Sequence, residues 1–276
     1  MGMLLGLPGH GIALAANDIE RGEYLTAASG CLSCHTDSKN DGAAFAGGYR
    51  IETPYGIFIT PNITPDAESG IGRWTEADFL AAMKDGEGPE GEYYYPAFPY
   101  PSYAGLTDQD VLDIRAYLAT VEPVAKHNEP HELEWYIPGR WAMGIWQWLF
   151  APWEYPATPD SDLVWQRGAY LARHLGHCGE CHTPRNIFGA LNISGELAGS
   201  PKGSSGGGGP NLTVSKEQGL GDWTKGDLEL FLELGMKPNG DFAGGGMTTV
   251  IDDNTSQLTP DDRAALILFL RNLPAH

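Results

Sequence analysis

The sequence has little positive charge and no long apolar run, and both shortages narrow what the chain can do. It carries 17 Lys and Arg against 36 Asp and Glu, a net charge of −19. Because nucleic-acid phosphates and anionic lipid headgroups both attract basic surfaces, this balance argues against either. A partner with a basic docking face, or simple solubility, fits the charge better. No stretch reaches the roughly 18 consecutive apolar residues of a membrane-spanning helix. Hydrophobic residues still make up 42% of the chain, which is enough for a buried core.

Cysteine is also scarce, and every cysteine belongs to a motif. The four occur in two copies of Cys-x-x-Cys-His, at residues 31–35 and 178–182. This spacing is the attachment signature of c-type haem, because two thiols three positions apart reach one edge of a porphyrin and the adjacent histidine is held below the iron. We therefore expect two covalently bound haem c groups. The predicted attachment residues are Cys31, Cys34, Cys178 and Cys181, and the predicted iron ligands are His35 and His182.

Three other interpretations of these cysteines fit less well. A zinc ribbon places its two Cys-x-x-Cys pairs about 15–20 residues apart, whereas Cys31 and Cys178 are 147 positions apart. A thioredoxin-like redox pair needs a βαβ pattern, which the sequence does not show. Two disulfides would leave the adjacent histidines unexplained.

The chain repeats itself in order, at offsets that run from 146 to 152 residues. We interpret this as a duplication in which only the loops changed length. The repeated words are Arg21–Leu25 with Arg167–Leu171, Asn62–Thr64 with Asn211–Thr213, Gly70–Thr75 with Gly219–Thr224, and Leu106–Asp108 with Leu258–Pro260.

Both copies are predicted to be mainly helical. Thr75, Thr107 and Thr259 stand as N-caps before helical runs, and after Thr107 and Thr259 apolar residues recur at i, i+3, i+4 and i+7. Residues 51–60 are predicted to form a small hairpin. The expected organisation is a first haem domain at 17–121, a connector at 122–162 and a second haem domain at 163–276.

The connector is rich in tryptophan. Six of the eight tryptophans lie between Trp135 and Trp165, and the run 141–150 is apolar on every side. Such a helix is either buried or docked on something. We expect it to pack between the two copies, with Met143 in the core. Contact with a partner or a membrane surface is the alternative.

The start of the chain, residues 1–16, is apolar and ends in Ala13-Leu14-Ala15-Ala16, with no Lys or Arg before Arg21. Two interpretations stay open. The segment is the end of a secretory signal peptide without its basic front, which predicts export, or it is a loose chain end.

Several words of the chain resemble those of a known family. The chain is similar to the c-type cytochrome subunits of periplasmic alcohol, aldose and related quinoprotein or flavoprotein dehydrogenases, with two haem domains rather than three. The likeness covers nearly the whole chain. The words are Asn-Ile-Thr-Pro-Asp at 62–66, Gly-Ile-Gly-Arg-Trp at 70–74, Tyr-Pro-Ala-Phe-Pro-Tyr-Pro-Ser-Tyr at 95–103, His-Cys-Gly-Glu-Cys-His-Thr-Pro-Arg-Asn at 177–186 and Gly-Gly-Gly-Met at 244–247.

This resemblance implies a fold, a place and a set of contacts. The expected fold is all-α, with two tandem class I cytochrome c domains joined by a Trp/Pro-rich connector, and the expected place is the periplasm. In such folds a proline carbonyl accepts the ring N–H of the proximal histidine, which fixes its tautomer. The matching prolines here are Pro61 and Pro210.

A methionine opposite the histidine raises the potential of a haem and suits electron transfer. Met247 lies 24 residues after Trp223 on a glycine-rich loop and is the predicted sixth ligand of the second haem. Met236 is closer to the preceding helix and is expected to pack. The same 24 residues counted from Trp74 lead to Phe98, which has no lone pair to donate, although the family word usually has methionine there.

The sixth ligand of the first haem is therefore open. Counting back from Met247 by the offset between Leu106 and Leu258 leads to Tyr95, our first candidate, since phenolate ligation of haem is known. For each tyrosine, packing with a hydrogen-bonded hydroxyl is the competing interpretation. The other candidates are Tyr93, Tyr94, His127, His131 or an open position.

These predictions lead to one main function and one alternative. The main function is a dihaem cytochrome c that relays electrons from a periplasmic dehydrogenase to a downstream redox partner or the respiratory chain. The alternative is an enzyme with small-molecule redox chemistry at the first haem, which lacks the expected methionine. The former, an electron-transfer protein or subunit rather than a self-sufficient enzyme, is favoured.

Overall fold

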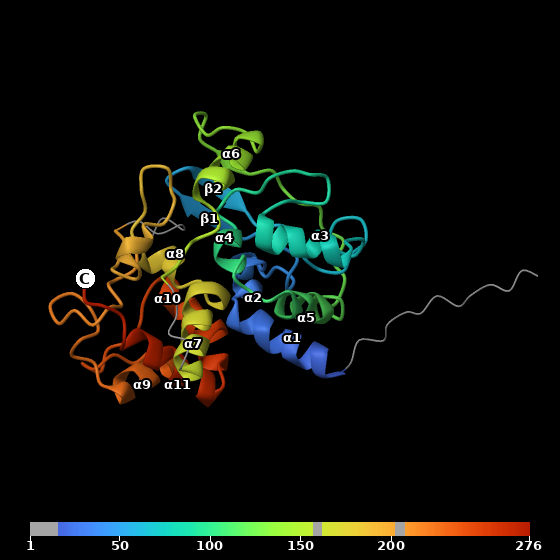
Figure 1. Ribbon diagram of the computed structural model, residues 1–276. Coiled ribbons are helices and arrows are strands. Elements are labelled where there is room, and N and C mark those ends of the chain that lie inside the picture. Colours follow the sequence, from blue (N-terminus) through green and yellow to red (C-terminus); the bar gives the residue numbers. More distant parts are fainter. Residues whose placement is uncertain (1–15, 157–161, 202–207) are drawn as a thin grey trace, which may run out of the picture.

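The computed structural model describes residues 16–156, 162–201 and 208–276 (Figure 1). Most of the predicted signal segment, residues 1–15, lies outside the described residues. The first half contains α1 (Ala16–Ala28), α2 (Cys31–Cys34), β1 (Arg50–Thr53), β2 (Gly56–Ile59), α3 (Glu76–Leu80), α4 (Tyr100–Tyr103) and α5 (Asp108–Leu118). The connector contains β3 (Glu132–Leu133) and α6 (Trp141–Phe150). The second half contains α7 (Leu163–Tyr170), α8 (Gly179–His182), α9 (Lys225–Leu234), α10 (Gly246–Asp253) and α11 (Pro260–Leu270).

Short turns of other helix types extend these elements. A π-helical turn continues α3 and another continues α7. These turns are Ala81–Asp85 and Leu171–Leu175, and the 3₁₀ turns are Ser38–Asn40, Ile193–Gly195 and Thr255–Gln257.

Threonine caps fix where the main helices begin. The side chains of Thr75, Thr107, Thr224 and Thr259 each accept the backbone N–H three residues further on. Each cap satisfies an otherwise unpaired donor and contributes about 1 kcal/mol. The helix starts predicted at 75, 107 and 259 are confirmed.

In each half the first helix packs against the last, α1 on α5 and α7 on α11 (Figure 1). A glycine in the repeated Arg-Gly-x-Tyr-Leu word makes this crossing close. A Cβ at Gly22 would lie 1.9 Å from the carbonyl oxygen of Asp113, and one at Gly168 would lie 2.0 Å from that of Ala265. No side chain fits at either position, so the helix backbones touch there.

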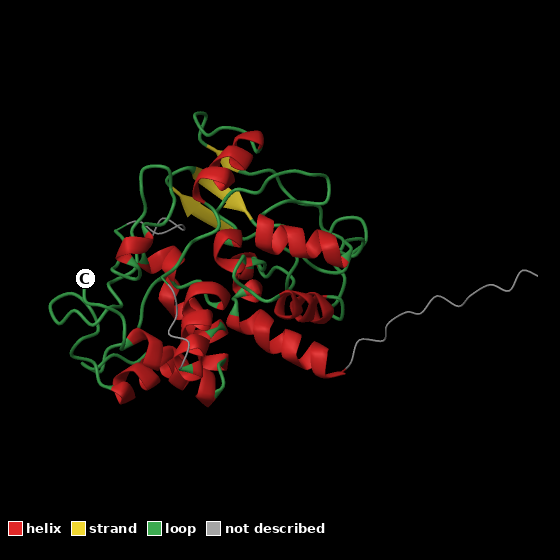
Figure 2. Ribbon diagram, viewed as in Figure 1, coloured by secondary structure: helices red, strands yellow, loops and turns green. Residues whose placement is uncertain are grey.

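The expectation of an all-α fold is wrong. Three antiparallel strands form a small sheet in the order β1-β2-β3 (Figure 2). The predicted hairpin at 51–60 is confirmed, with Ile51 paired to Phe58, and the connector adds β3 by pairing Glu132 with Ile57. Alternating β-branched and aromatic residues favour the hairpin. A strand of two residues, by contrast, is too short to leave a periodic pattern in the sequence.

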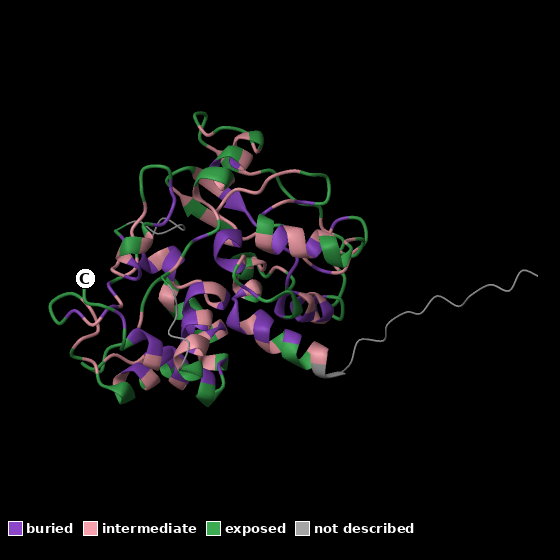
Figure 3. Ribbon diagram, in the orientation of Figure 1, coloured by how far each residue is buried: buried purple, intermediate pink, exposed green. Residues whose placement is uncertain are grey.

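Two separate tandem domains are likewise not confirmed. The buried apolar side chains of both halves form one continuous cluster, which includes Leu25, Val111 and Ile114 from the first half and Leu175 and Phe269 from the second. Buried positions run along the helices of both halves in Figure 3. The duplicated sequence therefore produces one shared core, because each copy buries apolar side chains against the other.

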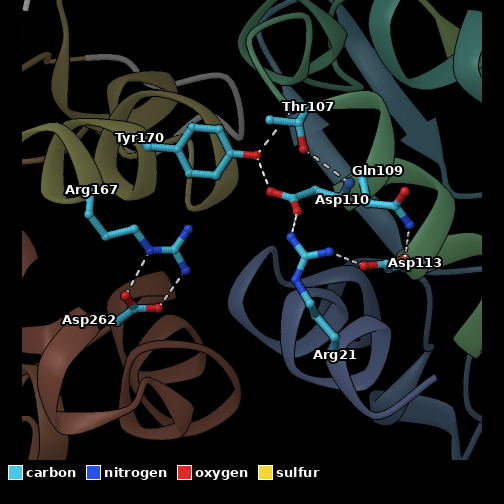
Figure 4. Close-up of polar contacts among 8 residues, drawn as sticks. All are labelled: Arg21, Thr107, Gln109, Asp110, Asp113, Arg167, Tyr170 and Asp262. Carbon is cyan, nitrogen blue, oxygen red and sulfur yellow. Dashed lines mark hydrogen bonds and ion pairs between the residues drawn. The ribbon is translucent and has the colours of Figure 1, made fainter. Parts of the chain in front are cut away.

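A reciprocal pair of hydrogen bonds links the two halves. The hydroxyl of Tyr24 in α1 donates to Asp262 in α11, and that of Tyr170 in α7 donates to Asp110 in α5 (Figure 4 shows the second contact). The N-cap threonine of each aspartate-bearing helix donates its backbone N–H to the same hydroxyl. The two halves thus exchange equivalent tyrosines across their interface.

The same aspartates bind the arginine of their own half. Arg21 contacts Asp110 and Asp113, and Arg167 donates both Nε and Nη2 to Asp262, at 2.7 and 2.6 Å (Figure 4). Bidentate arginine–carboxylate pairs have a fixed geometry. Each aspartate therefore joins a first helix, a last helix and the opposite half.

The connector packs between the halves on one side and is open on the other. Trp146 and Trp153 are buried in a cluster with Tyr100 of the first half and Leu191 of the second, as expected for packing between the copies. Met143 is buried as predicted. Among the described residues, no helix has both the length and the apolar character needed to cross a bilayer.

Candidate haem sites

The first Cys-x-x-Cys-His motif forms one helical turn, α2. Gly30 begins it with a left-handed backbone (φ 72°), and a Cβ there would lie 2.5 Å from Nδ2 of Asn254. The turn closes where the N–H of His35 donates to the carbonyl of Cys31 at 2.9 Å. Both thiols and the imidazole thereby come from a single turn of chain.

The ring of His35 is held by a backbone carbonyl. Its Nδ1 lies 2.8 Å from the oxygen of Pro61. Because a carbonyl only accepts, Nδ1 carries the proton and Nε2 keeps its lone pair. Burial lowers the pKa of His35, and the bond to Pro61 opposes that shift. At neutral pH the ring is thus a neutral imidazole with Nε2 available as a ligand.

The second motif repeats this geometry. Cys178 precedes α8, and Nδ1 of His182 lies 2.7 Å from the oxygen of Pro210. Burial lowers the pKa of His182 as well, against the effect of the Pro210 bond. A Cβ at Gly209 would lie 2.5 Å from Nδ1 of His182, so glycine lets the chain pass over the ring.

An asparagine after each proline fixes the loop that presents the carbonyl. Oδ1 of Asn62 accepts the N–H of Thr64 at 2.9 Å, and Oδ1 of Asn211 accepts the N–H of Thr213 at 2.7 Å. Such side-chain turns set the backbone direction locally. The repeated Asn-x-Thr word is therefore the device that aims each carbonyl at its histidine.

Burial keeps the thiols of Cys31, Cys34 and Cys178 protonated at neutral pH. Burial raises the pKa of Cys34 to about 12, with Cys31 and Cys181 adding to the shift, and it raises the pKa of Cys178 to about 12, with Cys181 adding there. Although burial dominates its pKa, Cys34 is also an exposed residue.

The chain segments that lead into the two Cys-x-x-Cys-His turns touch each other. Nε2 of His177 lies 3.3 Å from the carbonyl oxygen of Ser29, and the ring of Tyr103 packs edge-on against His177 with 5.4 Å between centroids. The hydroxyl of Ser29 is 3.2 Å from the sulfur of Cys31. Because Ser29 and His177 are 148 residues apart, no local pattern could have predicted this contact.

The predicted ligand Met247 lies in the first turn of α10 and is partly buried. A Cβ added at Gly244, Gly245 or Gly246 would meet nothing within 4 Å, so the start of α10 borders open space. Met247 is thus helical and does not lie on the glycine-rich loop that was expected to carry it. Met236 forms an isolated bridge with Phe242.

The structure gives Tyr95 a partner in the connector. Its hydroxyl donates to the carbonyl of Pro138 at 3.0 Å, and its ring packs against Phe58, with the guanidinium of Arg140 over it. Arg140 also donates to the carbonyl of Tyr93 at 3.1 Å. Tyr95 as an iron ligand stays a prediction.

Arg140 also brings other candidates together, because its guanidinium lies over the ring of Tyr94 and its Nη2 is 3.3 Å from Nε2 of His131. Tyr94 packs edge-on against Phe98, which in turn packs against Tyr103. His131 accepts a backbone N–H of β2 at 3.2 Å, and His127 is exposed. The rings of Tyr95 and His131 pack edge-on with 5.9 Å between centroids. The three tyrosines and His131 therefore lie together around Arg140.

Sequence reasoning missed a charged pair at the second turn. Glu180 lies between its two cysteines and contacts Arg185, and both side chains are largely buried. The signal was in the motif itself, since a charged residue inside the turn must find a partner when the turn is buried.

The residues present fit a covalently bound haem c. Each turn offers two thiols and one neutral histidine whose Nε2 is available, and Cys34 is exposed. These are the groups that thioether attachment and axial ligation require.

Comparisons with known proteins agree with this donor set. Residues 19–122 match the family model described as Cytochrome c. The chain is 42% identical over 261 residues to a "Diheme cytochrome c-type" of Cereibacter sphaeroides, covering 94% of this chain and 86% of that protein. It is also 40% identical to a "Gluconate 2-dehydrogenase cytochrome c subunit" of Pantoea cypripedii and 38% identical to a "Fructose dehydrogenase cytochrome subunit" of Gluconobacter japonicus.

The chain aligns with these two subunits over 94% and 93% of its own length but spans only 61% and 53% of theirs. The first relative, by contrast, is matched over most of its length. On this similarity, and on the two attachment turns with their proline-bound histidines, the chain belongs to the cytochrome c family.

Proposed function

We propose that this chain is a dihaem c-type cytochrome that relays electrons from a periplasmic dehydrogenase to a downstream redox partner or the respiratory chain. The observation that carries the proposal is the contact between Ser29 and His177, the segments that lead into the two attachment turns. Electron tunnelling slows steeply with distance, so two sites that share a contact suit a relay. The relatives named as dihaem cytochrome and as dehydrogenase subunits support the same function.

Haem c, when bound, supplies reversible one-electron exchange at its iron. The chain's own residues tether, orient and bury it. The thiols of Cys31 and Cys34, and of Cys178 and Cys181, would form the thioethers. The carbonyls of Pro61 and Pro210 fix the tautomer of the adjacent histidine and raise its basicity as a ligand.

We assign the sixth ligand of the second haem to Met247, in the first turn of α10, which borders open space. Met247→Ala is expected to change the spectrum of one haem and leave the other unchanged. Met236→Ala is the matched control, with no change expected. A Met247→Ala protein with both haem spectra unchanged would show the assignment to be wrong.

The partner is expected to present a basic face, because this chain carries a charge of −19. The exposed side of the connector offers an apolar contact beside this charge. Trp135, Trp141 and Trp148 are 91%, 71% and 82% exposed. Tryptophan is enriched at protein interfaces, and the negative charge disfavours an anionic membrane surface. We therefore propose that the dehydrogenase binds the exposed, tryptophan-rich side of the connector.

Two observations favour the alternative of small-molecule chemistry at the first haem. Phe98 stands where the family word has methionine, and the hydroxyl of Tyr95 is donated to Pro138. An iron without a sixth ligand from the protein would be high-spin and would bind carbon monoxide.

Optical and electron paramagnetic resonance spectra of the purified holoprotein separate the two functions. The relay predicts two low-spin haems that do not change with carbon monoxide or cyanide. A high-spin haem that binds either ligand would favour the alternative.

A further inference from the structure

The second attachment turn holds a buried ion pair that the first turn lacks. The side chain of Glu180, inside the Cys-x-x-Cys spacing, is 5% exposed, and that of its partner Arg185 is 12% exposed. The equivalent positions in the first turn, 147 residues earlier, are Ser33 and Ser38. The two turns thus differ in fixed charge while sharing their thiols and their histidine geometry.

Contacts from several elements hold these charges in place. Oε1 of Glu180 accepts from the hydroxyl of Ser102 at 2.8 Å and from Nε1 of Trp153 at 3.3 Å, and Oε2 accepts from Nη2 of Arg185. Nη1 of Arg185 donates to the carbonyl of Gly189 at 2.6 Å. The pair therefore ties α8 to α4 of the first half and to the connector.

The charge of Glu180 acts on the residues around the turns. Burial lowers the pKa of His177, and the negative charge of Glu180 opposes that shift. Burial raises the pKa of Tyr155, and Glu180 raises it further. A buried charge is poorly screened, so its field also reaches a group attached to the same turn.

We propose that the fixed charges of Glu180 and Arg185 set the reduction potential of the haem at the second turn and make it differ from that of the first. The inference rests on the proposed function. Accepting one electron from the donor adds no proton and lowers the net charge of the site by one. A buried carboxylate therefore disfavours reduction, and a buried guanidinium favours it.

A redox titration of the holoprotein, followed optically, tests the proposal with single charge changes. Glu180→Gln keeps the shape of the side chain and removes its negative charge. The equilibrium constant for reduction of the second haem is therefore expected to increase about tenfold, which raises its reduction potential by ~59 mV for one electron. Arg185→Gln removes the positive charge and is expected to lower the reduction potential of the same haem. Ser33→Glu places a carboxylate in the first turn and is expected to lower the reduction potential of the first haem.

Two further variants separate charge from packing. Glu180→Asp keeps the charge but shortens the side chain. In this variant the reduction potential of the second haem is expected to stay near the wild-type value. The double variant Glu180→Gln with Arg185→Gln removes both charges, and the potential of the second haem is expected to lie between those of the two single variants and closer than wild type to that of the first haem. It also provides a measurement if the single glutamate variant does not fold.

The outcomes distinguish this inference from the proposed function. If two haems are attached but Glu180→Gln and Arg185→Gln leave both reduction potentials unchanged, the inference is overturned and the proposed electron relay stands. The same conclusion follows if Glu180→Asp shifts the potential of the second haem as much as Glu180→Gln does. A chain without attached haem overturns both.

Discussion

Tyr24 and Tyr170, equivalent residues of the two sequence copies, each donate a hydroxyl to an aspartate of the opposite half. Their acceptors, Asp262 and Asp110, are themselves equivalent, so the interface has an approximate twofold relation that follows from the duplication. Each acceptor also binds an arginine of its own half. This exchange, together with the shared core, holds the two attachment turns against each other.

Removing either exchanged hydroxyl is expected to destabilise the protein. A hydrogen bond to a charged acceptor contributes about 1.5–3 kcal/mol. Tyr24→Phe and Tyr170→Phe should each lower the free energy of unfolding by this amount in a urea titration. Tyr117→Phe is the control, because its hydroxyl makes no hydrogen bond among the described residues, and little change is expected. Equal effects for all three variants would count against the exchange.

The close helix crossings predict opposite effects for two kinds of glycine. Gly22→Ala and Gly168→Ala would drive a Cβ into a carbonyl oxygen and are expected to cost about 1–3 kcal/mol or more. Gly226→Ala in α9 has nothing closer than 3.8 Å and should stabilise the protein by up to about 1 kcal/mol through helix propensity. Thermal denaturation measures both. A neutral Gly22→Ala would contradict the crossing.

The stability of the interface is expected to fall in acid. Burial raises the pKa of Asp262, but the hydrogen bonds from Arg167 and Tyr24 and the charge of Arg167 outweigh it, so the folded-state pKa lies below the usual value. The unfolded chain then takes up the proton more readily. The contribution of Asp262 is therefore full above about pH 4 and is lost as the pH falls through the folded pKa.

Urea midpoints at pH 7, 5 and 3 measure this dependence. Asp262→Asn should be less stable than wild type at pH 7 and should lose less stability between pH 5 and pH 3. If both proteins lose the same stability on acidification, Asp262 is not the group responsible.

Several features of the site and of the fold could be predicted because they depend on residues that are close together in the sequence. The Cys-x-x-Cys-His words, the threonine caps at 75, 107 and 259, and the hairpin at 51–60 all depend on residues within one turn or one strand pair. The two-residue strand β3, the single core and the tyrosine exchange depend on tertiary packing. The repeated Arg-Gly-x-Tyr-Leu word was visible in the sequence, but which half its tyrosine contacts could not be read from spacing.

Association with the electron donor is expected to depend on salt. A chain of charge −19 attracts a basic face over distances that salt screens, with a Debye length near 8 Å at physiological ionic strength. The second-order rate of reduction by the dehydrogenase should therefore fall as sodium chloride is added. A rate that does not change with ionic strength would contradict electrostatic docking.

Mass spectrometry of the denatured protein, purified from a host that attaches haem c, tests the central claim most directly. The account predicts a chain heavier than its polypeptide by two haem groups, with Cys31→Ala/Cys34→Ala and Cys178→Ala/Cys181→Ala each losing one. A bare polypeptide, or a wild-type chain that carries a single haem, would contradict it.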